Sequence, residues 1–327
     1  MADNLLVVRG LKQYYPVKGG LGKEPSYVKA VDNVDFEVRR GEVFGIVGES
    51  GCGKSTLGKS ICKLIEPTDG SIVLDGEEIA KYTPKQMRPI RKKVQMVFQD
   101  PYASLNPRFT ISQIIEEPLK LHNIYKTAAE RREKVEELMA LTGLSKRMYN
   151  MYPHEFDGGR RQRVVIARAL SLNPKFIICD EPVSALDVSV QAQIINLMME
   201  LQEKLGLTYV FISHDMSVIK HISTNIGVMY LGQMIEKASK NEIFRHPLHP
   251  YTIALLSAIP SVNIREKKEK IILKGEIGSP VNPKPGCRFA PRCMYAEDRC
   301  FAESPELKDM GNGHKVACHF CEKFYQK

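Results

Sequence analysis

A glycine-rich segment at residues 48–56 limits this chain to few folds, because it matches the pattern G-x-x-x-x-G-K-[ST]. The apolar residues 43–47 before it are typical of a buried strand, and residues 55–64 after it are typical of the start of a helix. A strand, a glycine-rich turn and a helix are the context in which this pattern wraps nucleotide phosphates. The segment therefore predicts an α/β fold with a nucleotide site at the turn.

Different residues of this loop are expected to make different contacts with the phosphates. The glycines let successive main-chain N–H groups point into one concavity, to which the helix N-terminus adds its positive end. Lys54 is expected to reach the β- and γ-phosphates, and Ser55 is expected to ligate Mg²⁺. The candidate nucleotide-binding residues here are Gly48, Ser50, Gly51, Cys52, Gly53, Lys54, Ser55 and Thr56.

Two adjacent carboxylates follow a second apolar run, at residues 176–179. This is the pattern of a Walker B motif, in which a buried strand ends in acidic residues. Asp180 is expected to hold Mg²⁺ through water, and Glu181 is expected to polarise the water that attacks the phosphate.

Bulk properties bound the class of protein. With 327 residues, 43% of them apolar, the chain can form two domains, or one large domain with an appendage. It has no apolar run long enough to cross a membrane and no signal-peptide layout at its start, so we expect a soluble, cytoplasmic protein. The net charge of +9 has three possible explanations: binding to nucleic acid, binding to an anionic membrane, or a basic surface exposed to solvent. The third explanation is the commonest.

The rest of the chain predicts an α/β core that a helical insertion interrupts. Residues 110–170 are rich in amphipathic, charged runs, and Thr127 with Glu130 forms a capping box. Loops are expected at residues 19–25 and in the charged linker at 265–270. Beside the strands already named, strands are expected at residues 5–8, 30–38, 70–76, 93–98 and 208–212, and a long helix at 189–205.

Together these motifs occur in the order seen in ATP-binding cassette (ABC) ATPases, which residues 1–260 resemble. The motifs are the loop at 48–56, Gln99 after a strand, Gly158 and Gly159 in a signature-like loop, Asp180 with Glu181, Asp187, and His214 after a strand. The resemblance implies a P-loop ABC-type nucleotide-binding domain with a helical subdomain at about 100–170. It also implies a head-to-tail dimer, with each ATP held between one chain's phosphate loop and the other chain's signature loop.

The resemblance further implies roles for single residues. Gln99 would contact the catalytic Mg²⁺ site and link it to the membrane partner, and His214 would contact the γ-phosphate. Asp187 would bridge the dimer, and Tyr15 would stack on adenine. Two alternatives stay open: His214 is a buried core histidine, or one of the neighbouring tyrosines, Tyr14 or Tyr27, takes the place of Tyr15.

The signature loop departs from the family pattern Ser-Gly-Gly-Gln, because Asp157 stands in the place of the serine and Arg160 in the place of the glutamine. An ionised carboxylate cannot donate a hydrogen bond and repels a triphosphate. Either Arg160 compensates this charge, or the site completed by Asp157, Gly158 and Gly159 is weakened and the chain works with a different ATPase subunit. We favour the second hypothesis, which predicts a heterodimer.

Five of the eight cysteines crowd the C-terminal segment. Cys52, Cys62 and Cys179 are expected to be ordinary small apolar residues. Residues 278–293, with the later cysteines, resemble the C-terminal extension of oligopeptide and dipeptide importer ATPases, and the resemblance implies a 4Fe–4S cluster. The expected ligands are Cys287, Cys293, Cys300 and Cys318, with Cys321 as an alternative fourth ligand. Zinc or plain reduced thiols remain alternatives.

We therefore predict an ABC ATPase domain at residues 1–260 and a linker with a small Cys-rich C-terminal extension at 261–327. The resemblance implies an ATPase on the cytoplasmic face of the cell membrane that powers peptide uptake. Its expected partners are a second, non-identical ATPase, two membrane permease subunits and an extracytoplasmic peptide-binding protein. An importer of nickel or another small solute is an alternative. So is a nucleic-acid-associated cassette ATPase, although we expect no nucleic-acid partner.

Overall fold

The computed structural model describes residues 3–17, 25–259, 270–273 and 275–324. The chain divides into two compact units, each of which is described by itself. The first comprises residues 1–38, 42–81 and 213–327, and the second comprises residues 39–41 and 82–212. The expected loop at 19–25 and the charged linker at 265–270 lie outside the described residues, apart from Pro25 and Lys270.

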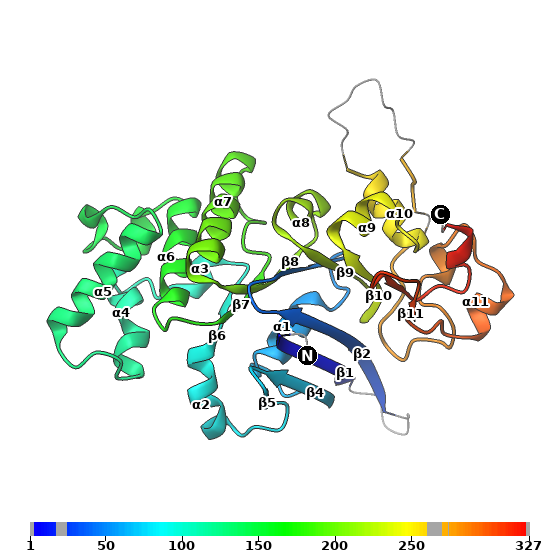
Figure 1. Ribbon diagram of the computed structural model, residues 1–327, viewed down its shortest axis with the longest axis horizontal. Coiled ribbons are helices and arrows are strands. Elements are labelled where there is room, and N and C mark those ends of the chain that lie inside the picture. Colours follow the sequence, from blue (N-terminus) through cyan, green and yellow to red (C-terminus); the bar gives the residue numbers. More distant parts are fainter. Residues whose placement is uncertain (1–2, 18–24, 260–269, 274, 325–327) are drawn as a thin grey trace. The chain divides into compact units, whose positions relative to one another are not determined.

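An antiparallel sheet in the first unit is formed by four strands in the order β2-β1-β4-β5 (Figure 1). Their bounds are β1 Asn4–Val17, β2 Ser26–Arg39, β4 Asp69–Leu74 and β5 Glu77–Glu78. Leu6 pairs with Leu74 and Val8 with Ile72, and all four side chains are buried. The strands expected at 5–8 and 30–38 are therefore confirmed, but both extend further than the sequence predicted.

A second set of strands in the first unit runs in the order β11-β12-β10-β9-β3. Strand β3 is parallel to β9, while the other neighbours are antiparallel. All five residues of β3 are buried, as the apolar run predicted. The bounds are β3 Val43–Val47, β9 Asn225–Tyr230, β10 Gln233–Ser239, β11 Lys308–Asp309 and β12 Lys315–Val316. The helices of this unit are α1 Lys54–Ile61, α8 Met216–Ile222, α9 Lys240–Arg245, α10 Pro250–Ser257 and α11 Asp298–Ala302.

The C-terminal segment packs within the first unit. Strand β12 pairs with β10, where Glu236 lies opposite Val316. Val316 is fully buried and packs with Leu248 and Cys321. Short 3₁₀ helices at Ala290–Arg292 and Cys321–Lys323 complete the segment. This cysteine-rich segment therefore shares a core with strand β10 and the residues before helix α10.

The second unit contains the parallel strands β8-β7-β6 and most of the helices. Strands β6 Val94–Val97, β7 Phe176–Asp180 and β8 Thr208–Ser213 match the expected strands, although Ser213 itself falls in the first unit. The helices are α2 Pro84–Lys93, α3 Pro101–Ser104, α4 Ile111–Leu121, α5 Ala128–Leu141, α6 Gly158–Leu170 and α7 Val188–Leu205.

The helical insertion is present as predicted. Helices α4, α5 and α6 pack against one another (Figure 1). The capping box at the start of α5 is confirmed, because Thr127 and Glu130 exchange side-chain to main-chain hydrogen bonds of 2.9 and 3.2 Å. Among the helices described, none has the length and apolar character needed to cross a membrane.

Candidate nucleotide-binding site

The phosphate loop joins β3 to α1 and passes close to strand β2. Gly53 caps α1 with a φ of +104°, a conformation that residues with a side chain rarely adopt. A Cβ atom on Gly53 would lie 1.9 Å from the carbonyl oxygen of Ala30. The glycine is therefore required both by its backbone conformation and by the close approach of β2.

Lys54 lies inside the loop that precedes it. Its side chain is buried, and Nζ donates hydrogen bonds to the carbonyl oxygens of Gly48 at 2.7 Å and Glu49 at 2.9 Å. Cys52 is buried beside it, and burial raises the pKa of this thiol, so the cysteine is neutral and packs as a small apolar residue, as predicted. The loop thus encloses an ammonium group at the N-terminus of a helix, an arrangement suited to a polyanion.

His214 and Tyr15, the other expected contacts in the first unit, both have exposed side chains. His214 follows β8 and precedes Asp215, which caps α8 by accepting from the N–H of Ser217 at 2.7 Å. The alternative of a core histidine is wrong, because His214 is not buried. Tyr14 differs from Tyr15, because its hydroxyl is hydrogen-bonded to Asp32.

Gln99 and Glu181 meet in the second unit. Gln99 Nε2 donates to Glu181 Oε2 at 3.0 Å, and the main-chain N–H of Glu181 donates to the carbonyl of Ile212 at 3.0 Å. Glu181 has a φ of +47°, which is uncommon for a residue with a side chain and is found where a fold fixes a functional group. Asp180 and Glu181 are only 3% and 9% exposed. The structure therefore brings together two of the three predicted catalytic residues, and the adjacent Asp180 offers the oxygen ligands that Mg²⁺ prefers.

Asp157 acts as the N-cap of helix α6. Its carboxylate accepts a hydrogen bond from the N–H of Arg160 at 2.8 Å and lies 3.4 Å from the Arg160 side chain. The carboxylate thus satisfies the helix terminus that a serine hydroxyl can also cap. Both side chains are at least half exposed, which leaves the carboxylate facing solvent and only weakly compensated.

The two signature glycines are required by their neighbours. A Cβ atom on Gly159 would lie 2.6 Å from Val190 Cγ1, and one on Gly158 would lie 2.8 Å from Leu186 Cδ2. Asp187 lies between these two contacts, at the start of α7, and its exposed side chain makes no capping hydrogen bond. The signature loop and the loop that carries Asp187 are therefore packed together within the second unit.

The C-terminal cysteines line one small cavity. Cys287, Cys293, Cys300 and Cys318 all face a space of about 20 Å³, which is the size of a water molecule. Burial raises the pKa of Cys287 to about 11 and of Cys318 to about 12, so both are protonated thiols near neutral pH. Within the described residues, no group of three or more His, Cys, Asp or Glu has the geometry to hold a metal ion. The four thiols have the donor chemistry of a thiolate-bound metal group. The cavity is too small for such a group unless the side chains move apart. The predicted metal centre is therefore not confirmed.

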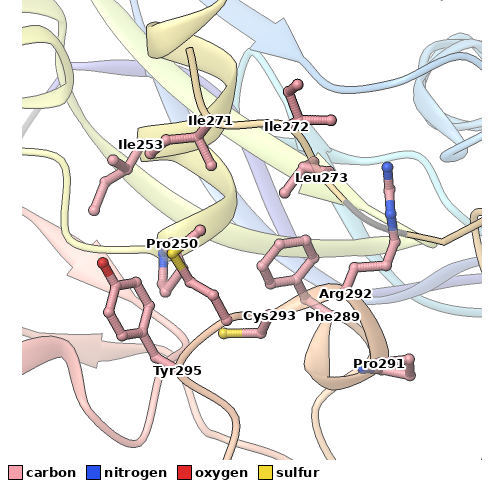
Figure 2. A pocket seen from close by; sticks show the side chains of 11 residues that line it. Pro250, Ile253, Ile271, Ile272, Leu273, Phe289, Pro291, Arg292, Cys293 and Tyr295 are labelled. Atoms are coloured by element: carbon pink, nitrogen blue, oxygen red, sulfur yellow. The ribbon is translucent and has the colours of Figure 1, made fainter. Parts of the chain in front are cut away.

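A larger cavity, of about 290 Å³, lies beside these cysteines (Figure 2). Its walls are mostly apolar, with the Arg292 guanidinium and the Tyr295 hydroxyl as polar groups, and none of the predicted nucleotide-binding residues contributes to them. The cavity is lined by Pro250, Ile253, Ile271, Ile272, Leu273, Phe289, Pro291, Arg292, Cys293, Met294 and Tyr295. With so few polar groups it is not the nucleotide site.

The sequence did not predict three residues that contact the phosphate loop or the strand β2 beside it. Arg292 binds the Glu49 carboxylate, the Tyr251 hydroxyl accepts from the Glu49 N–H, and Arg288 binds Asp32. Arg288 and Arg292 lie between Cys287 and Cys293, where charged residues are otherwise expected to face solvent. No local pattern indicates these contacts, because the residues that form them are far apart in the sequence.

Comparison with protein families agrees with this geometry. The family described as "ABC transporter" matches residues 31–184, which contain the phosphate loop, Gln99, the signature loop and Glu181. A second family, "Oligopeptide/dipeptide transporter, C-terminal region", matches residues 235–300. A Bacillus subtilis (strain 168) protein named oligopeptide transport ATP-binding protein AppF is 54% identical over 321 residues, which cover 97% of each chain. The chain belongs to the ABC transporter family.

Other relatives of this ABC protein extend over nearly its whole length. The dipeptide transport ATP-binding protein DppF of Escherichia coli (strain K12) is 51% identical over 96% of this chain and 93% of its own. A solved structure of the ATP-binding cassette MJ0796, a dimer bound to ADP and Pi in a post-hydrolysis state, covers 72% of this chain and 98% of its own. It has 30% sequence identity and a TM-score of 0.64. The predicted P-loop ABC fold is therefore confirmed.

Replacement of Lys54 tests the phosphate loop directly. We expect Lys54→Ala to abolish ATP binding, because it removes the buried ammonium group that the loop encloses. Titration with a fluorescent ATP analogue measures this loss. Lys59→Ala, in the same helix but outside the loop, is the matched control and should keep the affinity of the unmodified chain. Equal affinity in the Lys54→Ala and Lys59→Ala proteins would contradict the assignment.

Proposed function

We propose that this chain is an ATP-hydrolysing subunit of an ABC importer that powers uptake of oligopeptides or dipeptides from the cytoplasmic face of the cell membrane. The observation that carries the proposal is the Gln99–Glu181 contact of 3.0 Å within an ABC cassette whose C-terminal region matches peptide transporters. Relatives of nearly equal length are named oligopeptide or dipeptide transport ATP-binding proteins. The C-terminal match favours peptides over nickel or another small solute.

In this proposal the two carboxylates and the loop act on one MgATP. The main-chain N–H groups of residues 48–56 and the Lys54 ammonium hold the phosphates, and Tyr15 stacks on adenine. Ser55, Gln99 and Asp180 would supply oxygen ligands for Mg²⁺, and the metal would neutralise charge on the phosphates. Glu181 would orient the attacking water. The Gln99 amide donates to the Glu181 carboxylate, and Gln99 would link this site to the membrane partner. His214 contacts the γ-phosphate.

The transport step follows from closure of two ATPase subunits around ATP. ATP binds the closed pair more tightly than the open one, so binding drives closure and hydrolysis releases it. Helices α3 to α6 would transmit this motion to two permease subunits, and an extracytoplasmic protein would deliver the peptide. Peptide specificity would then belong to those partners, because the ATPase does not contact the cargo.

Glu181→Gln tests the catalytic assignment in the complex reconstituted with its permeases and binding protein. The amide keeps the shape of the side chain but loses the general base, so we expect ATP turnover to fall by roughly 100-fold or more while ATP binding remains. Peptide uptake into vesicles should stop together with turnover. Glu200→Gln, in helix α7, is the control and should behave as the unmodified complex. Uptake that continues at the normal rate in Glu181→Gln would exclude the proposal.

We further propose that the functional dimer pairs this chain with a second, non-identical ATPase. Asp157 presents a carboxylate where a hydroxyl donor would serve the γ-phosphate, and its partner Arg160 is half exposed. A homodimer would place this repulsion in both sites, whereas a heterodimer confines it to one. The site formed by this chain's own phosphate loop would be completed by the partner's signature loop.

Dimerisation measured in the Glu181→Gln background separates these possibilities. We expect no ATP-dependent homodimer from this chain alone by size-exclusion chromatography, because each interface carries a repelling carboxylate. The additional change Asp157→Ser retains a helix cap and supplies a donor, so it should permit the homodimer. If the Glu181→Gln chain with Asp157 intact already forms an ATP-dependent homodimer, and the unmodified chain alone hydrolyses ATP at the full rate, the heterodimer hypothesis is wrong.

For the cysteine cavity we propose a 4Fe–4S cluster held by Cys287, Cys293, Cys300 and Cys318, with zinc as the alternative metal. The convergence of four thiols on one apolar cavity supports it. A bound metal would cross-link a segment that has little regular structure, and binding would release the thiol protons.

Anaerobic purification provides the test of this cofactor. We expect a broad visible absorption band together with iron and sulfide, all lost in Cys318→Ser and retained in Cys321→Ser, because Cys318 lines the cavity and Cys321 does not. Colourless protein with stoichiometric zinc would establish the alternative metal. Colourless protein without metal would mean that the cysteines are plain thiols.

A further inference from the structure

The carboxylate of Glu49, the second residue of the phosphate loop, is bound by the C-terminal segment. Arg292 Nη1 lies 2.7 Å from Glu49 Oε2, and Nη2 lies 3.1 Å from Oε1, so the two planar groups meet through parallel hydrogen bonds. The Arg292 side chain is 8% exposed and that of Glu49 is 24% exposed. This pair is therefore shielded from solvent, unlike the flexible ion pairs of a protein surface.

The main chain of Glu49 is fixed as well. Its N–H donates to the hydroxyl of Tyr251 at 2.9 Å, and its carbonyl oxygen accepts from Lys54 Nζ at 2.9 Å. Glu49 thus connects the lysine that is expected to bind phosphate with helix α10 and with Arg292. The side chain and the main chain of Glu49 are thus both held by hydrogen bonds.

A buried aromatic cluster holds Arg292 at this position. The rings of Tyr230, Tyr251 and Phe289 pack edge to face or tilted, with centroids 4.8 to 5.4 Å apart. All three are among the largest fully buried side chains of the described residues. Arg292 Nη1 lies 3.4 Å from the Tyr230 hydroxyl, and the arginine borders the cavity next to Phe289 and Cys293 (Figure 2).

A second arginine from the same turn reaches the other side of the loop. Arg288 binds the Asp32 carboxylate and the carbonyl oxygen of Leu231. The next residue, Gly232, donates its N–H to the carbonyl of Cys52 at 2.8 Å and accepts from the N–H of Asp32 at 2.8 Å. The turn between Cys287 and Cys293 therefore contacts the phosphate loop in two ways. Arg292 binds Glu49 directly, and Arg288 binds Leu231, whose neighbour Gly232 is hydrogen-bonded to Cys52.

We propose that Arg292 is a positioning residue for ATP: the cysteine-rich segment sets the ATP affinity of the chain by pairing with Glu49 in the phosphate loop. This inference rests on the proposed binding of ATP at that loop. A carboxylate beside the triphosphate repels it unless a cation neutralises the carboxylate, and Arg292 is the cation that contacts Glu49. The carbonyl oxygen of the same residue accepts from Lys54 Nζ at 2.9 Å.

The charge pattern leads to an asymmetric test in the full-length chain. Arg292→Ala leaves the Glu49 carboxylate without this partner, so we expect the dissociation constant for MgATP to rise about tenfold. Glu49→Gln removes the repelling carboxylate together with the ion pair, so it should raise the dissociation constant less than Arg292→Ala does. The double variant Arg292→Ala/Glu49→Gln should recover most of the loss, because the repelling charge is absent.

Titration with a fluorescent ATP analogue gives the affinities, and steady-state turnover in the assembled complex gives the KM and kcat for ATP. We expect Arg292→Ala to raise KM and leave kcat within about twofold, since Glu181 and Gln99 are unchanged. Arg299→Ala is the matched control. This arginine lies in the same segment and pairs with Glu303 at 3.0 Å, but both side chains are exposed, so its loss should leave the affinity unchanged.

Three results would overturn the inference. They are unchanged affinity in Arg292→Ala, a loss of kcat without a rise in KM, and no recovery in the double variant although its thermal unfolding midpoint equals that of the unmodified chain. Lys54→Ala, measured alongside, distinguishes an error about Arg292 from an error about the ATP site itself. If Lys54→Ala abolishes binding while Arg292→Ala does not weaken it, only the role of Arg292 is wrong. If Lys54→Ala also binds normally, the loop is not the ATP site.

Discussion

The close approach of the phosphate loop to the strand behind it is the constraint on which the rest of the site depends. Gly53 leaves no room for a Cβ atom against the Ala30 carbonyl, so loop and strand β2 hold a fixed position relative to one another. The loop leads into α1, where Lys54 Nζ donates hydrogen bonds to the carbonyl oxygens of Gly48 and Glu49. In the proposed site, the main-chain N–H groups of the loop and the buried Lys54 ammonium would together bind the phosphates.

In the second unit, too, constraints on the main chain fix the positions of the predicted functional groups. Glu181 occupies an uncommon left-handed conformation that strand β8 fixes through Ile212, and Gln99 holds its carboxylate. Asp157 fulfils the structural task of capping α6 although it lacks the hydroxyl expected at this place. The carboxylate therefore caps the helix as a serine hydroxyl would, but it cannot donate the hydrogen bond that the proposed contact with a partner's nucleotide would need.

The C-terminal segment lies in the same compact unit as the phosphate loop. Strand β12 extends the sheet at β10, and Phe289 packs against the tyrosines of β9 and α10. Two arginines between two cysteines use this packing to reach residues around the loop. The segment is therefore connected by hydrogen bonds to residues in and around the phosphate loop.

Local patterns in the sequence determined the elements whose cause is local: the strand, loop and helix at residues 43–61, the capping box of Thr127 and Glu130, and the carboxylates at the end of β7. These follow from hydrophobic periodicity, glycine conformation and capping chemistry within a few residues. Only the tertiary structure decided that Arg292 meets Glu49 across 243 residues, that Arg288 meets Asp32 across 256, and that the four cysteines share one small cavity. Such contacts leave no periodic signal, because they depend on how buried aromatic side chains and paired strands bring distant segments together.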